Sequence, residues 1–176
     1  KAGPATRFLS WAWLNQVRDF IAALKAWRDR DGLHASKEYL WICFFNNNQF
    51  RLSKNADNLE QVFESRLKII GSMVALLDDW RSPAYCTRMW TVYEQYTATE
   101  EGIPVIIIMP PEKNASLITE LQAGGFDEVV QFIDKINVKD ANTYNKDDKA
   151  RITERIERTQ GGFEKVDETV KARMSE

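Results

Sequence analysis

The apolar segment Tyr39–Phe45 constrains the fold of this chain more than any other feature. All of its residues are apolar, so a strand built from them has no polar side to turn toward water. Strands that are buried on both faces belong to parallel sheets that helices cover on each side. We therefore predict that Tyr39–Phe45 is a strand in the interior of a parallel sheet.

Segments with helical periodicity alternate with segments of strand length. Further strands are predicted at Thr6–Ser10, Met73–Leu77 and Ile103–Met109. The helices between and after them are predicted over Asn15–Arg28, Asn58–Ile70, a segment that begins at Thr87 and ends near Gly102, and Ala115–Gln122. This alternation predicts a three-layer, flavodoxin-like α/β fold with a parallel sheet.

The last part of the chain has the pattern of helices. Asp147–Arg158 and Glu164–Arg173 are predicted to be helical, whereas Val129–Ile133 fits either a fifth strand or a helical turn. We divide the chain into an α/β domain over residues 1–135 and a helical C-terminal extension over residues 136–176 that packs on the same domain.

Composition excludes several classes of protein. The net charge of -2 gives no basic surface for a nucleic acid or a membrane. No apolar stretch is long enough to span a bilayer, and no secretory signal is visible. Cys43 and Cys86 have no metal-binding or redox spacing, which favours a reducing compartment. We expect a cytoplasmic protein.

The chain lacks the usual sequence motifs of several enzyme classes. No glycine-rich phosphate loop follows the first predicted strand, which argues against a dinucleotide-dependent dehydrogenase. No GxSxG motif occurs, and His34 is the only histidine. We expect neither a metal site nor a bound cofactor.

The candidate site lies at the start of the helix that opens at Thr87. Trp90 and Glu94 are four residues apart, so an indole and a carboxylate share one helix face. The helix follows the strand Met73–Leu77, and ligands of open α/β sheets bind at the carboxyl ends of strands. The alternative is that Trp90 packs in the core while Glu94 is solvated.

Four segments in order resemble a TIR (Toll/interleukin-1 receptor) domain, in particular a divergent TIR-like group of algae and other protists. The resemblance covers about residues 5–110 and rests on Phe8-Leu9-Ser10-Trp11-Ala12-Trp13, Trp41 through Asn48-Gln49, Trp80 to Pro83, and Thr87 to Glu94. Three positions depart from that group: Trp11 replaces His, Cys43 replaces Asp and Thr91 replaces Cys.

The resemblance implies cleavage of NAD, as a substrate, at the bond between nicotinamide and ribose. Nicotinamide leaves as a neutral molecule, so one carboxylate that stabilises the oxocarbenium charge is sufficient. Glu94 is the catalytic candidate, and we expect it to be partly exposed. The expected substrate-binding residues, which should converge on one cleft with Glu94, are Ser10, Trp11, Trp13, Trp80 and Trp90. Asp78 and Asp79 are reserve carboxylates if Glu94 is buried elsewhere, and a solvated turn is the alternative interpretation of both. The alternative for Ser10 is a cap at the entry to the helix.

The same resemblance supports a second hypothesis, a non-catalytic module that self-associates or recruits partners. Its candidate contact loop contains Asn46, Asn47, Asn48 and Gln49 and extends to Lys54. A plain turn is the alternative interpretation of these residues. The pair Trp90–Glu94 favours the enzyme, and the departures at Trp11 and Cys43 favour the interaction module.

Overall fold

The computed structural model describes residues 3–47, 59–143 and 146–175. Its centre is a parallel sheet of four strands, β1 (Arg7–Trp11), β2 (Leu40–Ile42), β3 (Met73–Leu76) and β4 (Val105–Ile108). The strand order is β2-β1-β3-β4, which matches the first four strands of the flavodoxin-like order. The predicted fold class is therefore confirmed, including the prediction that the first and third strands are neighbours.

The second strand differs from its prediction in length and in position. β2 spans only Leu40–Ile42 and lies at the edge of the sheet, and the chain then forms the short helix α2 (Cys43–Asn46). The side-chain Oδ1 of Asn46 accepts a hydrogen bond from the Ile42 backbone N–H at 2.6 Å, which draws the chain into a helical turn. The prediction of a central strand over Tyr39–Phe45 was wrong, and Phe44 and Phe45 are 47% and 69% exposed.

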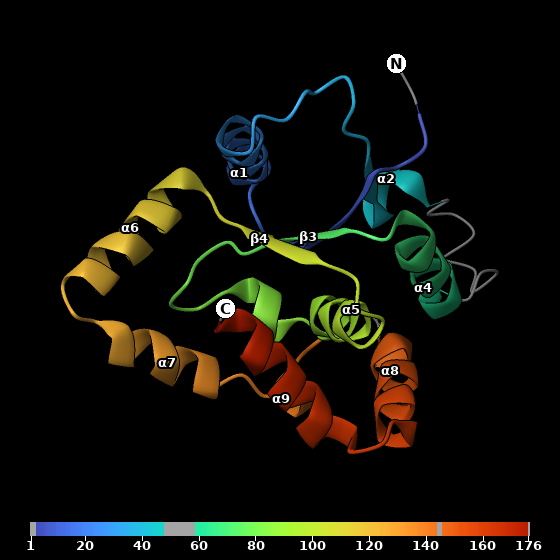
Figure 1. Ribbon diagram of the computed structural model, residues 1–176. Coiled ribbons are helices and arrows are strands. Elements are labelled where there is room, and N and C mark those ends of the chain that lie inside the picture. Colours follow the sequence, from blue (N-terminus) through green and yellow to red (C-terminus); the bar gives the residue numbers. More distant parts are fainter. Residues whose placement is uncertain (1–2, 48–58, 144–145, 176) are drawn as a thin grey trace.

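Alternation along the strands divides the interior into two apolar clusters. On β1, Phe8 belongs to one cluster and Leu9 to the other, and on β3 Met73 and Val74 are divided in the same way. Helix α1 (Val17–Arg30) covers one face of the sheet, and α4 (Leu59–Ile70), α5 (Met89–Glu100), α8 (Lys146–Arg158) and α9 (Gly162–Met174) pack on the other (Figure 1).

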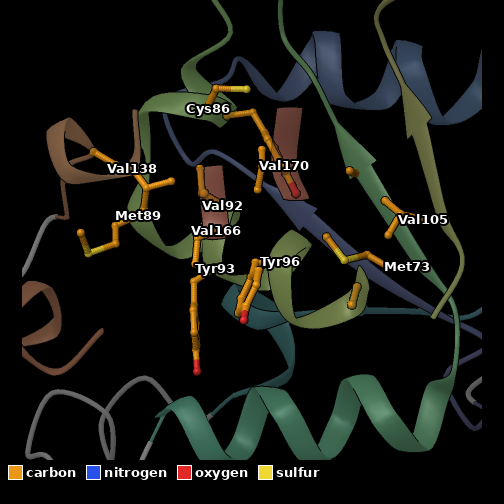
Figure 2. Close-up of a cluster of buried hydrophobic side chains, with 14 of the residues drawn as sticks. Met73, Cys86, Met89, Val92, Tyr93, Tyr96, Val105, Val138, Val166 and Val170 are labelled. Carbon is orange, nitrogen blue, oxygen red and sulfur yellow. The ribbon is translucent and has the colours of Figure 1, made fainter. Parts of the chain in front are cut away.

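Helix α5 is the central helix of the larger layer. Eight of its 12 residues are buried, because the sheet covers one side and α8 and α9 cover another. Figure 2 shows how Val92 and Tyr96 of α5 gather with Val166 and Val170 of α9 beneath the strands. The C-terminal helices thus complete the same core that the strands begin.

The remaining elements connect these layers. The 3-10 helix η1 (Ala84–Thr87) leads into α5. Helix α6 (Pro111–Gln122) lies beyond β4, and α7 (Phe126–Asp134) follows α6. A second 3-10 helix, η2 (Val138–Asp140), leads toward α8. The segment Val129–Ile133 is helical within α7, and the described residues contain no fifth strand. None of the helices described has both the length and the apolar character needed to cross a membrane.

Candidate functional site

A pocket of about 130 Å³ opens where the chain leaves β1 and β2 and where α5 begins. This is the edge of the sheet at which open α/β folds bind ligands. Aromatic and apolar side chains form most of its lining, with two carboxylates and one guanidinium among them. The residues of its lining include Trp11, Trp13, Cys43, Phe63, Arg88, Trp90, Thr91, Glu94 and Asp148.

Glu94 lines this pocket and is 8% exposed. The prediction that it is partly exposed was therefore wrong. Burial raises the pKa of the Glu94 carboxyl to about 7, and a hydrogen bond from Ser10 acts in the opposite direction. A carboxyl group with this pKa exists in both protonation states near neutral pH, which is a property common in catalytic acids and bases.

Ser10 is the partner that orients the carboxyl group of Glu94. Its Oγ donates to Glu94 Oε2 at 2.5 Å. Ser10 follows Leu9 on β1, so strand alternation turns its side chain toward α5 rather than toward α1. Glu94 Oε1 has no hydrogen-bond partner among the described residues, which leaves this oxygen available to a ligand.

Tyr85 extends this contact into a buried chain of three polar groups. Its hydroxyl lies 3.0 Å from Ser10 Oγ, and the whole residue has an exposed fraction of 0%. Burial raises the pKa of the Tyr85 phenol well above its ordinary value. Sequence analysis missed Tyr85, because the loop between β3 and α5 carries no pattern that indicates which of its side chains turns inward.

Trp90 is held in place by a residue of the C-terminal helices. Its Nε1 donates to Asp148 Oδ2 of α8 at 3.2 Å, and its ring meets the edge of Phe63 with centroids 6.0 Å apart. Arg151 of the same helix donates to Asp148 at 2.5 Å and to the buried Glu60 at 2.8 Å. Trp90 therefore packs against the core and also lines the pocket.

Trp11 and Trp13 both line the pocket, but they differ in their surroundings. The ring of Trp11 packs against Phe20 of α1, with centroids 4.7 Å apart. Trp13 is 45% exposed and meets Phe44 of α2 edge to face, with centroids 5.4 Å apart. Trp13 thus forms part of the rim of the pocket, and Trp11 contributes from the end of β1.

Trp80 does not join the pocket, so this part of the predicted convergence was wrong. Its Nε1 donates to Ser116 of α6 at 3.4 Å, and the Arg81 guanidinium covers its ring at 4.0 Å. The tryptophan thereby anchors the loop after β3 to α6. Asp79 lies in the same loop and accepts from Lys113 at 2.7 Å, which makes it part of this anchor.

Asp78 is not a lining residue of the pocket either. Burial raises the pKa of its carboxyl, while backbone N–H groups of Ala84 and Tyr85 lower it.

The residues that depart from the TIR-like pattern also lie at the pocket. Burial and the neighbouring charge of Glu94 raise the pKa of the Cys43 thiol to about 12, so the thiol is neutral at physiological pH. Thr91 donates to the backbone oxygens of Tyr85 and of Arg88, which fastens the first turn of α5 to the preceding loop.

The predicted contact loop is only partly described. Asn46 ends α2 and caps the edge strand, and Asn47 donates from Nδ2 to Cys43 Sγ at 3.1 Å. Asn48 and Gln49 lie outside the described residues. The two described asparagines make local contacts at the junction of β2 and α2, and their role in a contact surface stays a prediction.

The lining of the pocket contains two acidic residues, tryptophans and an arginine. Within the described ranges, no group of three or more histidine, cysteine, aspartate or glutamate side chains is arranged to hold a metal ion. Glu94 and the aromatic side chains are thus the groups that this pocket presents to a ligand.

Comparison of the chain with protein-family models, with curated proteins and with solved structures gives no match.

Proposed function

We propose that this protein hydrolyses NAD, or a related nucleotide, at the bond between nicotinamide and ribose. The observation that supports the proposal is the buried carboxylate of Glu94 at a pocket with indole groups in its lining: one of its oxygens accepts from Ser10, and the other has no hydrogen-bond partner among the described residues. NAD is the substrate in this proposal, and no further cofactor is needed.

The size of the pocket suits one ring of such a substrate. Its volume of about 130 Å³ is close to the roughly 150 Å³ of an engineered cavity that binds benzene. In this proposal the aromatic ring of nicotinamide enters the pocket, and the attached ribose and phosphates extend out of it past Trp13 at the rim. The Arg88 guanidinium lines the pocket and is a suitable partner for a phosphate or a ribose hydroxyl.

The proposed chemistry requires Glu94 in its ionised form. Departure of neutral nicotinamide leaves positive charge on the ribose, and a carboxylate in a site shielded from water stabilises that charge strongly. Because the pKa of Glu94 is about 7, the ionised fraction increases from pH 6 to pH 8. The rate of nicotinamide release should increase over the same range.

Incubation of the purified protein with NAD, followed by measurement of free nicotinamide, tests the proposal. Glu94→Gln keeps the shape of the side chain and removes its charge, so it should lower the rate by at least about a hundredfold, as loss of a transition-state charge partner does. Glu157→Gln, at an exposed position in the last turn of α8, is the matched control and should leave the rate unchanged. Equal rates for wild type and Glu94→Gln would reject the proposal.

A second candidate function is self-association without catalysis, and one observation favours it. Several large apolar side chains near the pocket rim are exposed, namely Trp13, Leu14, Val17, Phe44 and Phe45. Exposed apolar groups that lie together often mark a protein–protein contact. Sedimentation velocity over a concentration series is the test, with Phe45→Ser as the variant that should abolish any association. A wild-type monomer at every concentration would reject it.

A further inference from the structure

The buried contact between Tyr85 and Ser10 assigns a role to a residue that does not itself line the pocket. We propose that Tyr85 is a positioning residue, which holds the Ser10 hydroxyl in the orientation that donates to Glu94 and so keeps one carboxylate oxygen free for the ligand. This inference rests on the proposed function, because it concerns how Glu94 is prepared for its reaction.

The direction of the hydrogen bonds follows from the number of protons available. Ser10 has one hydroxyl proton and can accept from other groups. An ionised Glu94 can only accept, so the Ser10 proton lies in the 2.5 Å contact with Oε2. The 3.0 Å contact must then use the Tyr85 proton, with Ser10 as the acceptor. Tyr85 donates to Ser10, and Ser10 donates to Glu94.

The opposite direction of the two hydrogen bonds, from Glu94 to Ser10 and from Ser10 to Tyr85, is unfavourable. If a protonated Glu94 donated to Ser10 and Ser10 donated to Tyr85, the phenol proton of Tyr85 would need another acceptor. Among the described residues, the Tyr85 hydroxyl has no hydrogen-bond partner other than Ser10. A buried donor without an acceptor is costly, so the network favours the ionised carboxylate.

The other groups that face Glu94 do not provide this function. Cys43 comes from the β2–α2 junction, and the high pKa of its thiol keeps it neutral. Asp148 of α8 accepts a hydrogen bond from Arg151, and Arg88 lies directly before α5. Tyr85 and Ser10 are therefore the groups that connect Glu94 to the interior of the fold.

The test is Tyr85→Phe, which removes only the hydroxyl group. The pKa of Glu94, followed by carbon-13 NMR of glutamate side chains and assigned with Glu94→Gln, should increase by roughly 0.5 to 1, the effect of losing one ordinary hydrogen bond. The pH profile of nicotinamide release should shift by the same amount. At pH 6 the rate should decrease roughly three- to tenfold, and at pH 9 it should be nearly that of wild type.

Tyr93→Phe is the matched control, since it removes a phenol hydroxyl from the same core. The Tyr93 hydroxyl donates to Glu64 Oε1 at 3.0 Å and accepts from Arg155 Nε at 2.9 Å, so it takes no part in the hydrogen bonds that connect Tyr85, Ser10 and Glu94. This variant should change neither the pKa of Glu94 nor the pH profile. Tyr85→Phe in a Ser10→Ala background should likewise have no further effect on Glu94, because the connecting hydroxyl is already absent.

A measurement on the wild-type protein keeps the inference testable if Tyr85→Phe does not fold. The ring Cζ resonance of Tyr85 should titrate with the same midpoint as Glu94, and a resonance that does not titrate would overturn the inference. An unchanged pKa of Glu94 in folded Tyr85→Phe would overturn it as well. If the pKa changes as expected while no variant releases nicotinamide, the positioning role stands and the proposed function fails.

Discussion

Burial of the Glu94 carboxyl should make the stability of this protein depend on pH. The pKa of Glu94 is raised from 4.5 to about 7 in the folded protein. Each unit of difference between folded and unfolded states corresponds to about 1.4 kcal/mol, so Glu94 should destabilise the fold by about 3 kcal/mol when it is fully ionised. That is a large share of the roughly 5–15 kcal/mol by which domains are stable.

The sign of the effect follows from which state binds the proton more tightly. Below about pH 4.5 the group is protonated in both states and has no cost. Between pH 4.5 and pH 7 the folded protein keeps the proton that the unfolded chain releases, so stability decreases as pH increases. Above pH 7 both states are ionised and the full cost remains.

Glu94→Gln removes this titration and keeps the acceptor for Ser10. We expect its free energy of unfolding, compared with that of wild type, to increase by about 3 kcal/mol between pH 4.5 and pH 8.5. Guanidinium unfolding followed by tryptophan fluorescence measures both proteins across this range. Glu157→Gln should follow wild type at every pH. Parallel curves for wild type and Glu94→Gln would show that the carboxyl group is not desolvated and would refute the argument.

Three further outcomes follow from contacts described above. Asp148→Ala removes the acceptor of the Trp90 indole N–H and should increase the KM for NAD several-fold with a smaller change in kcat, measured by nicotinamide release. Trp80→Phe should leave that rate within about twofold of wild type, because Trp80 lies outside the pocket. Burial raises the pKa values of Cys43 and Cys86 to about 12, so iodoacetamide at pH 8 should label them far more slowly in native than in unfolded protein, as mass spectrometry would show.

The sheet could be predicted from the sequence because β2, β3 and β4 carry unbroken apolar runs. Met73–Leu76 is buried along its whole length, as its composition indicates. The proximity of Ser10 and Glu94 could also be predicted from the sequence. Neighbouring strands β1 and β3 bring the end of the first strand close to the helix that follows the third. The hydrophobic periodicity, the lengths of the segments and the rule for strand order were sufficient to predict these features.

The missed features depend on tertiary contacts that leave no local pattern. Phe44 and Phe45 are apolar yet exposed, so an apolar run did not distinguish an edge strand followed by a helix from a central strand. Asp148 meets Trp90 from a helix far along the chain. Trp80 is anchored to α6 instead of the pocket, since an indole at a loop fits either place equally well.

The position of α5 between the sheet and α9 has a consequence for synthesis on the ribosome. Roughly sixty residues separate the end of α5 from the start of α9, and translation adds roughly 5–20 residues per second. For several seconds the nascent chain therefore contains all four strands and α5, while the surface of α5 that α9 later covers is open to water. Apolar surface that is exposed in this way promotes aggregation and attracts chaperones. The interval before residues 162–174 emerge is thus the period in which this fold is most vulnerable.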